Sequence, residues 1–155
     1  MPSPINFPTK PFYIMSRLDN SNWVLTLTPQ GAVVMRHLTS TNDQLWKATP
    51  DPRGGAFLTH VGTGLVLAYQ LQRSFPEGET PGGPLLSANL DTADPKQLWR
   101  CEDLGFGSSG INAFLDWERK INIYHSDPNG TVGLYKWDNG PNEKWILFQE
   151  AGESK

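Results

Sequence analysis

Gln44-Leu45-Trp46, Gln97-Leu98-Trp99 and Glu143-Lys144-Trp145 are the stretches of this sequence that decide its fold, because one short motif returns three times. The tryptophans lie about 50 residues apart, a spacing typical of an internal structural repeat. Three such units nearly fill the 155 residues. The sequence therefore predicts a single domain over residues 10–150, with repeats at about 10–50, 55–103 and 109–150, a short leader at 1–9 and a tail at 151–155.

Prolines and glycines interrupt the whole chain, and with 13 of the first and 15 of the second there is no room for long helices. Between these breaks lie short runs rich in β-branched and aromatic residues, four in each repeat. Twelve short strands in three groups of four favour a closed all-β architecture without long exposed edges. The expected strands are 12–15, 23–27, 32–35 and 44–47, then 56–59, 65–69, 84–87 and 97–100, and finally 111–114, 121–124, 131–135 and 145–148.

Composition and charge narrow the classes of partner. The formal net charge is −3 and neither Lys nor Arg gathers into a stripe, so nucleic acid is not an expected partner. No apolar run is long enough to insert into a membrane, and residues 1–8 lack the basic and apolar character of a secretion signal. Cys101 is the only cysteine, so no intrachain disulfide forms. These features predict a cytoplasmic or nucleocytoplasmic location.

The repeated Gln-x-Trp motif on a twelve-strand threefold pattern resembles the ricin-B-type lectins, whose fold is the β-trefoil with pseudo-threefold symmetry. The resemblance covers roughly residues 10 to 150 and is strongest in the third repeat, over 129–145. Leu134-Tyr135-Lys136-Trp137 stands where the plant Euonymus-type lectins carry a Leu-Trp-x-Trp pattern, which makes that branch the most similar. The resemblance implies a defence-related lectin that binds galactose- or N-acetylgalactosamine-type glycans and needs no metal or cofactor.

The three tryptophans bear on the fold, because in a trefoil they point inward while the polar residue two positions earlier pins a turn. Sugar recognition needs other residues, namely an aromatic face and planar amide or carboxylate groups that bridge hydroxyls. By the resemblance, Asn142 and Glu143 occupy the family's Asn-Gln positions and Tyr135 that of its stacking aromatic. The predicted carbohydrate-binding residues are Asn122, Tyr124, Tyr135, Trp137, Asn142 and Glu143.

The third repeat also departs from the family pattern. The usual aspartate of the second strand is replaced by Asn122 or Tyr124, depending on the strand register, and Asp127 is a further candidate. Glu143 replaces the usual glutamine, which exchanges a donor and an acceptor for two acceptors. The first two repeats offer Leu25 and Val66 where an acidic partner is needed. We therefore expect one site per chain, in the third repeat, with a weak second in the first.

Other classes of function compete with the lectin. A β-trefoil can also be a protease inhibitor, which here would use the Arg73-containing loop 72–83, although no disulfide braces this loop. A third possibility is a trefoil that has lost its ligand and binds protein. No catalytic motif is present and the three histidines are scattered, so an enzyme is not expected. One shallow site crosslinks nothing, so a homodimer is one route to useful avidity.

Overall fold

The computed structural model describes residues 4–18, 22–69, 85–124, 130–136 and 140–149. The first repeat holds β2 (Phe12–Ser16), β3 (Trp23–Leu27), β4 (Val33–His37), the 3₁₀ helix η1 (Asn42–Gln44) and β5 (Trp46–Pro50). The second holds β6 (Ala56–His60), β7 (Val66–Ala68), β8 (Leu86–Ala88), η2 (Pro95–Gln97) and β9 (Leu98–Gly105). The third holds β10 (Ser108–Ala113), β11 (Asp116–Ile123), β12 (Val132–Lys136), η4 (Pro141–Glu143) and β13 (Trp145–Gln149).

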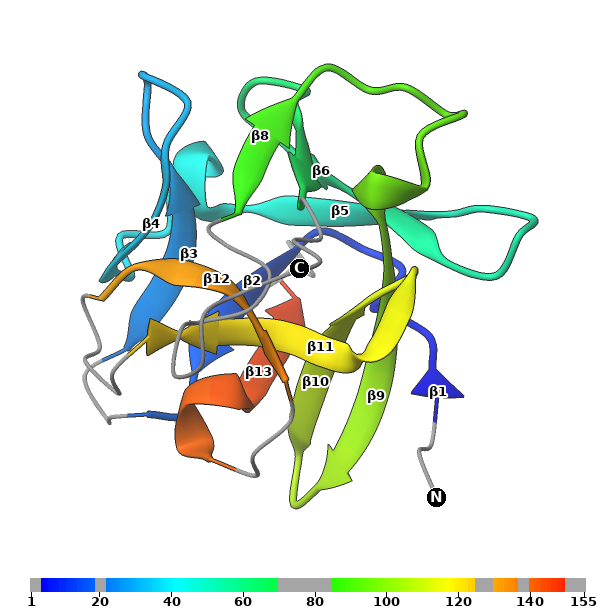
Figure 1. The fold of residues 1–155 in the computed structure, drawn as a ribbon. Coiled ribbons are helices and arrows are strands. Elements are labelled where there is room, and N and C mark those ends of the chain that lie inside the picture. The colour runs from blue at the N-terminus through cyan, green and yellow to red at the C-terminus, as the bar shows by residue number, and fades with distance from the viewer. Residues whose placement is uncertain (1–3, 19–21, 70–84, 125–129, 137–139, 150–155) are drawn as a thin grey trace, which may run out of the picture.

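Six of these strands close into a barrel. The antiparallel pairing runs from β2 through β5, β6, β9, β10 and β13, and β13 returns to β2. The other strands form three hairpins, β3–β4, β7–β8 and β11–β12, one in each repeat. The β3–β4 and β11–β12 hairpins are labelled in Figure 1. This arrangement is the β-trefoil, so the predicted all-β class and threefold strand pattern are confirmed.

The three repeated tryptophans, Trp46, Trp99 and Trp145, lie in the barrel core, where all are fully buried. Each indole Nε1 donates a hydrogen bond to a backbone carbonyl on the second strand of its own repeat. The acceptors are Leu25 at 3.1 Å, Leu67 at 3.0 Å and Ile121 at 3.1 Å. Because a buried indole N–H needs an acceptor, these bonds fix the hairpin of each repeat against the barrel.

The polar residue of each motif lies in a 3₁₀ helix, and the strand begins after it. The expected strands at 44–47 and 97–100 therefore start later, at Trp46 and Leu98. Gln44 accepts from the backbone N–H of Thr39 at 2.7 Å, and its Nε2 donates to the carbonyl of His37 at 2.7 Å. Gln97 bonds in the same way, to Asp91 N at 2.8 Å and Asn89 O at 2.9 Å. These side chains pin the turn, as the motif predicts.

The leader also contributes to the fold, through a thirteenth strand that the sequence pattern does not predict. This strand, β1 (Pro4–Ile5), pairs antiparallel with β9, and Ile5 stands opposite Cys101. Phe7 stacks on Phe12 of β2 with 6.2 Å between ring centroids. A cavity of about 790 Å³ lies between the leader and the barrel, with Ile5, Phe7 and Trp99 among its lining residues. The leader thus packs over one end of the barrel.

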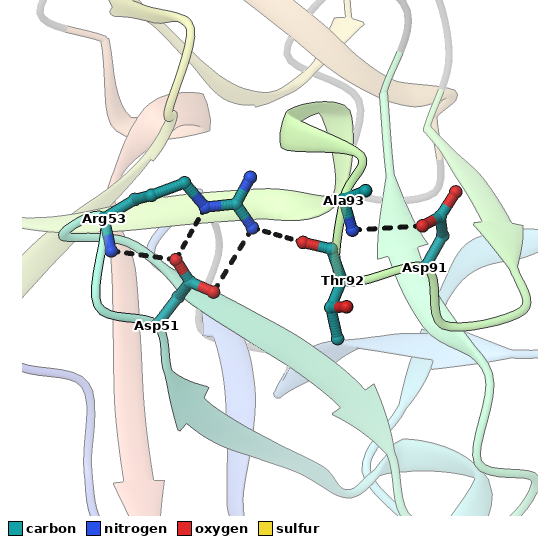
Figure 2. A network of polar contacts seen from close by, with 5 residues as sticks. All are labelled: Asp51, Arg53, Asp91, Thr92 and Ala93. Atoms are coloured by element: carbon teal, nitrogen blue, oxygen red, sulfur yellow. Dashed lines mark hydrogen bonds and ion pairs between the residues drawn. The ribbon is translucent and has the colours of Figure 1, made fainter.

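A polar network joins the β5–β6 turn to the segment before η2 (Figure 2). Arg53 Nε lies 2.7 Å from Asp51 Oδ2, and the Arg53 guanidinium also donates to the carbonyl of Thr92. The Asp91 side chain accepts from the backbone N–H of Ala93 at 3.0 Å, which fixes the turn that carries the Thr92 carbonyl.

In the part of the chain that the structure describes, no helix is long and apolar enough to cross a lipid bilayer.

Candidate functional site

The β11–β12 hairpin carries three of the six predicted binding residues, Asn122, Tyr124 and Tyr135. Lys120 stands opposite Tyr135 and Asn122 opposite Gly133 in the antiparallel register. Because side chains alternate along a strand, Asn122 and Tyr135 share one face of the hairpin. The other face, with Ile121 and Ile123, packs in the core. Gly133, which stands opposite Asn122, has no side chain, and both residues are buried.

Asn142 reaches the same hairpin from η4. Its Nδ2 donates to Asn122 Oδ1 at 3.2 Å and to the carbonyl of Ile123 at 2.9 Å. Asn122 is 2% exposed, and its Nδ2 is a buried donor with no acceptor among the described residues. A buried donor without an acceptor costs about 1–3 kcal/mol, so this N–H does not contribute to the stability of the fold.

Two tyrosines accompany this amide pair. Tyr124 extends the β11 ladder, since its N–H donates to the carbonyl of Thr131 at 2.9 Å, and its hydroxyl donates to the carbonyl of Leu134 at 3.0 Å. Burial raises the pKa of the Tyr124 phenol to about 12, so the hydroxyl stays protonated at neutral pH. Tyr135 is half-buried on β12. The hairpin therefore combines amide groups with aromatic rings.

The remaining predicted residues are placed differently. Glu143 follows Asn142 in η4 and is fully buried, at the position that Gln44 and Gln97 hold in the other repeats. Trp137 lies outside the described residues, as does the alternative candidate Asp127. The structure thus brings Asn122 and Asn142 into contact and places Tyr124 and Tyr135 on the same hairpin.

The tryptophan bonds align the three repeats residue by residue. Since Leu25, Leu67 and Ile121 accept equivalent bonds, the positions equivalent to Asn122 are Thr26 and Ala68. The prediction that Leu25 and Val66 hold this position is therefore wrong by one or two residues of register. Thr26 Oγ1 already donates to the carbonyl of Val24 at 3.1 Å, and Ala68 has no polar side chain. Of the three positions, only Asn122 presents an unpaired donor.

Sequence reasoning missed a buried charged group next to the site. Lys120 is 2% exposed; its ammonium forms an ion pair with Glu102 and donates to Asn112 Oδ1 at 3.2 Å. The sequence gives little indication that Lys120 is buried, because the charged run Glu118-Arg119-Lys120 is typical of an exposed loop. Across the described residues, no group of three or more His, Cys, Asp or Glu side chains is arranged to hold a metal ion.

By sequence, the chain matches no protein-family model and no curated protein. By structure, it is similar to the designed threefold-symmetric protein ThreeFoil, with 17% identity, a TM-score of 0.74, and 90% of this chain and 99% of that one covered. It is also similar to the ricin B-like lectin of Macrolepiota procera in complex with lactose, with 13% identity, a TM-score of 0.71, and coverage of 94% and 99%. The earthworm R-type lectin C-half in complex with GalNAc gives 21% identity, a TM-score of 0.61, and coverage of 91% and 99%. The chain thus shares the β-trefoil fold of ricin B-like and R-type lectins.

Proposed function

We propose that this chain is a carbohydrate-binding protein of the lectin type, which recognises galactose- or N-acetylgalactosamine-containing glycans through its third repeat. The Asn122–Asn142 pair carries the proposal, because Asn122 Nδ2 is a buried donor with no acceptor in the described part of the chain. The side chain of Asn142 also carries an amide oxygen, which by its chemistry is an acceptor. A donor and an acceptor held together match two neighbouring hydroxyls of a sugar ring.

The other predicted residues take distinct parts in the proposed site. Tyr124 and Tyr135 supply aromatic surface on the hairpin, and Trp137 is proposed to extend it. Glu143 is fully buried, so we assign it to holding η4, and with it Asn142, in place. The site needs no metal or cofactor, because amide groups and rings suffice to orient a sugar.

The sugar class is supported by structural neighbours. The Macrolepiota procera lectin is seen with lactose, a galactose-containing disaccharide, and the earthworm lectin with GalNAc. The Euonymus-like Leu134–Trp137 pattern extends the proposal to a role in defence. A shallow site for one sugar typically binds near 1 mM, about −4 kcal/mol, so an oligosaccharide or a homodimer would be required for strong binding.

A glycan array, followed by calorimetry with lactose and N-acetylgalactosamine, tests this function. We expect Asn142→Ala to weaken sugar binding at least about tenfold, because the substitution removes the amide that positions Asn122. Trp137→Ala is expected to weaken binding similarly. Lys96→Ala is the matched control, because Lys96 is the exposed residue at the same position of η2 in the second repeat.

Two outcomes contradict the proposal. Unchanged affinity in both Asn142→Ala and Trp137→Ala would exclude the third repeat as the site. A blank array would exclude the lectin function and turn attention to the protease-inhibitor alternative through loop 72–83, which lies outside the described residues.

A further inference from the structure

A guanidinium within cation–π distance of two aromatic rings, that of Arg100, lies on β9. The Arg100 guanidinium carbon is 4.6 Å from the ring centroid of Phe114 and 6.0 Å from that of Trp117. Arg100 belongs to β9, Phe114 follows β10, and Trp117 belongs to β11. All three side chains are half-buried, so this group, which we call the Arg100 cluster, is partly open to solvent.

The Arg100 cluster depends on an irregularity that is specific to the third repeat. Asn112 pairs with Lys120 but the next residue, Ala113, pairs with Asp116, so residues 117–119 are extra on β11. This bulge carries Trp117 toward Arg100. The corresponding strands β3 and β7 are five and three residues long, against eight for β11. Bulges of this kind commonly redirect a side chain at a functional site.

The cluster contains two hydrogen-bond donors that lack acceptors. Arg100 Nε and Trp117 Nε1 are both buried and have no partner among the described residues. Leaving such donors unpaired is costly, and a purely structural cluster would be expected to satisfy them. A guanidinium and an indole N–H on neighbouring strands would be satisfied by a ligand that carries several acceptor oxygens.

The charge of Arg100 also favours a ligand with acceptor oxygens, in particular an anion. The neighbouring cations already have carboxylate partners, since Lys120 pairs with Glu102, and Arg119 pairs with Asp116 at 2.9 Å. Arg100 is in no ion pair within the described residues. The rings of Phe114 and Trp117 interact with its charge by cation–π attraction, and the fork of a guanidinium matches the geometry of an oxyanion.

We propose that the Arg100 cluster binds an oxyanion, the carboxylate or sulfate ester of an acidic saccharide. The guanidinium supplies the charge and a bidentate edge, and the Trp117 indole supplies a further donor. The site for the anion stands on the geometry of the cluster alone, whereas a saccharide as its carrier rests on the proposed function. Trp117 and Asn122 are separated by five residues of β11 that include the bulge, so the two positions are at most about 17 Å apart along the strand.

The indole N–H of Trp117 reports directly on the anion. Its ¹H–¹⁵N resonance is followed while sodium sulfate, or separately sodium glucuronate, is added at constant ionic strength. We expect a saturable shift with at least one anion, and its loss in Arg100→Gln. Arg36→Gln is the matched control, because Arg36 is an exposed arginine on β4 and its loss changes the net charge equally. Far-UV circular dichroism verifies that each variant is folded.

Other outcomes overturn the proposal. A shift that rises linearly without saturation, or that is equal in Arg100→Gln and Arg36→Gln, would show general salt effects and no site. If Arg100→Gln does not fold, Trp117→Phe keeps the ring and removes the N–H donor. Its sulfate and glucuronate affinities, measured by calorimetry, should then fall several-fold, and unchanged affinities would exclude the Trp117 donor.

The identity of the carrier is tested separately. Galactose 6-sulfate and galactose are compared by calorimetry on the unmodified protein, on Arg100→Gln and on Asn142→Ala. We expect the sulfate to increase affinity in the unmodified protein and not in Arg100→Gln. An anion shift with no preference for the sulfated sugar would keep the anion site and overturn the saccharide as its carrier. If the unmodified protein binds neither sugar but still shows the saturable anion shift, only the proposed lectin function is contradicted.

Discussion

Glu143 is the residue at which the chemistry of the three repeated motifs diverges. Gln44 and Gln97 each accept a backbone N–H and donate to a backbone carbonyl. Glu143 occupies the same position and is fully buried, but a carboxylate has no N–H to donate to a backbone carbonyl. We expect Glu143→Gln to raise the free energy of unfolding by about 1 kcal/mol, measured by urea denaturation at pH 7.

The reciprocal substitution is the control. Gln97→Glu replaces a buried amide, 3% exposed, and removes the donor to the Asn89 carbonyl. It should lower the free energy of unfolding by about 2 kcal/mol. A destabilising Glu143→Gln would instead mean that the carboxyl makes contacts that an amide cannot replace.

At this scale the sequence predicted the inward tryptophans and the turn-pinning glutamines correctly. It failed on the register of the second strand, where Thr26 and Ala68 stand at the position assigned to Leu25 and Val66. The reason is physical: in a strand of three to five residues, a slip of one residue moves every side chain to the opposite face. The register is fixed by contacts between separate segments, namely the tryptophan bonds and the strand pairings.

The β5–β6 turn is the element whose electrostatics can be measured most directly. The side-chain hydrogen bond from Arg53 lowers the pKa of the Asp51 carboxyl below its ordinary 3.8. Because the pKa is lowered in the folded state, the stabilisation is present above the unfolded value and is lost as pH falls through the folded one. We expect Arg53→Met to raise the pKa of Asp51, measured by NMR titration of the carboxyl carbon.

Arg36→Met is the control for this titration, since Arg36 lies on β4 and is not part of the network of Figure 2. The Asp51 pKa should be the same in that variant as in the unmodified protein. An Asp51 titration that is unaffected by Arg53→Met would contradict the assigned cause.

Elements could be predicted where composition is apolar and not where it is polar. The strands of the barrel follow runs of β-branched and aromatic residues, and these were found. β1 was missed because proline is rare inside strands, and the start of β11 because Asp116–Lys120 is mostly charged. β1 is held in the sheet by pairing with β9, and the start of β11 by pairing with β10. These are tertiary contacts, so they cannot be predicted from the local composition of either segment.

At the scale of the whole molecule, the barrel core protects the single thiol. Burial raises the pKa of Cys101 to about 11, and the side chain is 2% exposed. The thiolate is the reactive form, so on the order of one molecule in a thousand is ionised at pH 8. We expect iodoacetamide to alkylate the native protein at pH 8 at least about 100-fold more slowly than the unfolded protein.

The control is a variant with an exposed thiol, Ala32→Cys in a Cys101→Ala background, because Ala32 is exposed next to β4. Its alkylation should be fast whether or not the protein is folded. If the native thiol of Cys101 reacted as fast as this control, the barrel would have to open readily around β9.

The pairing of β13 with β2 has a consequence for the order of the chain. Phe12 and Gln149 are opposite each other in the register, about 5 Å apart between Cα atoms. A few residues could therefore join the two ends of the trefoil, and the chain could be cut instead within the β5–β6 turn without removing any barrel pairing. Such a circular permutant would run from the second repeat through the third to the first, and it should still close the same ring. The barrel pairing is cyclic, so a chain that starts at β6 can form the same ring of six strands.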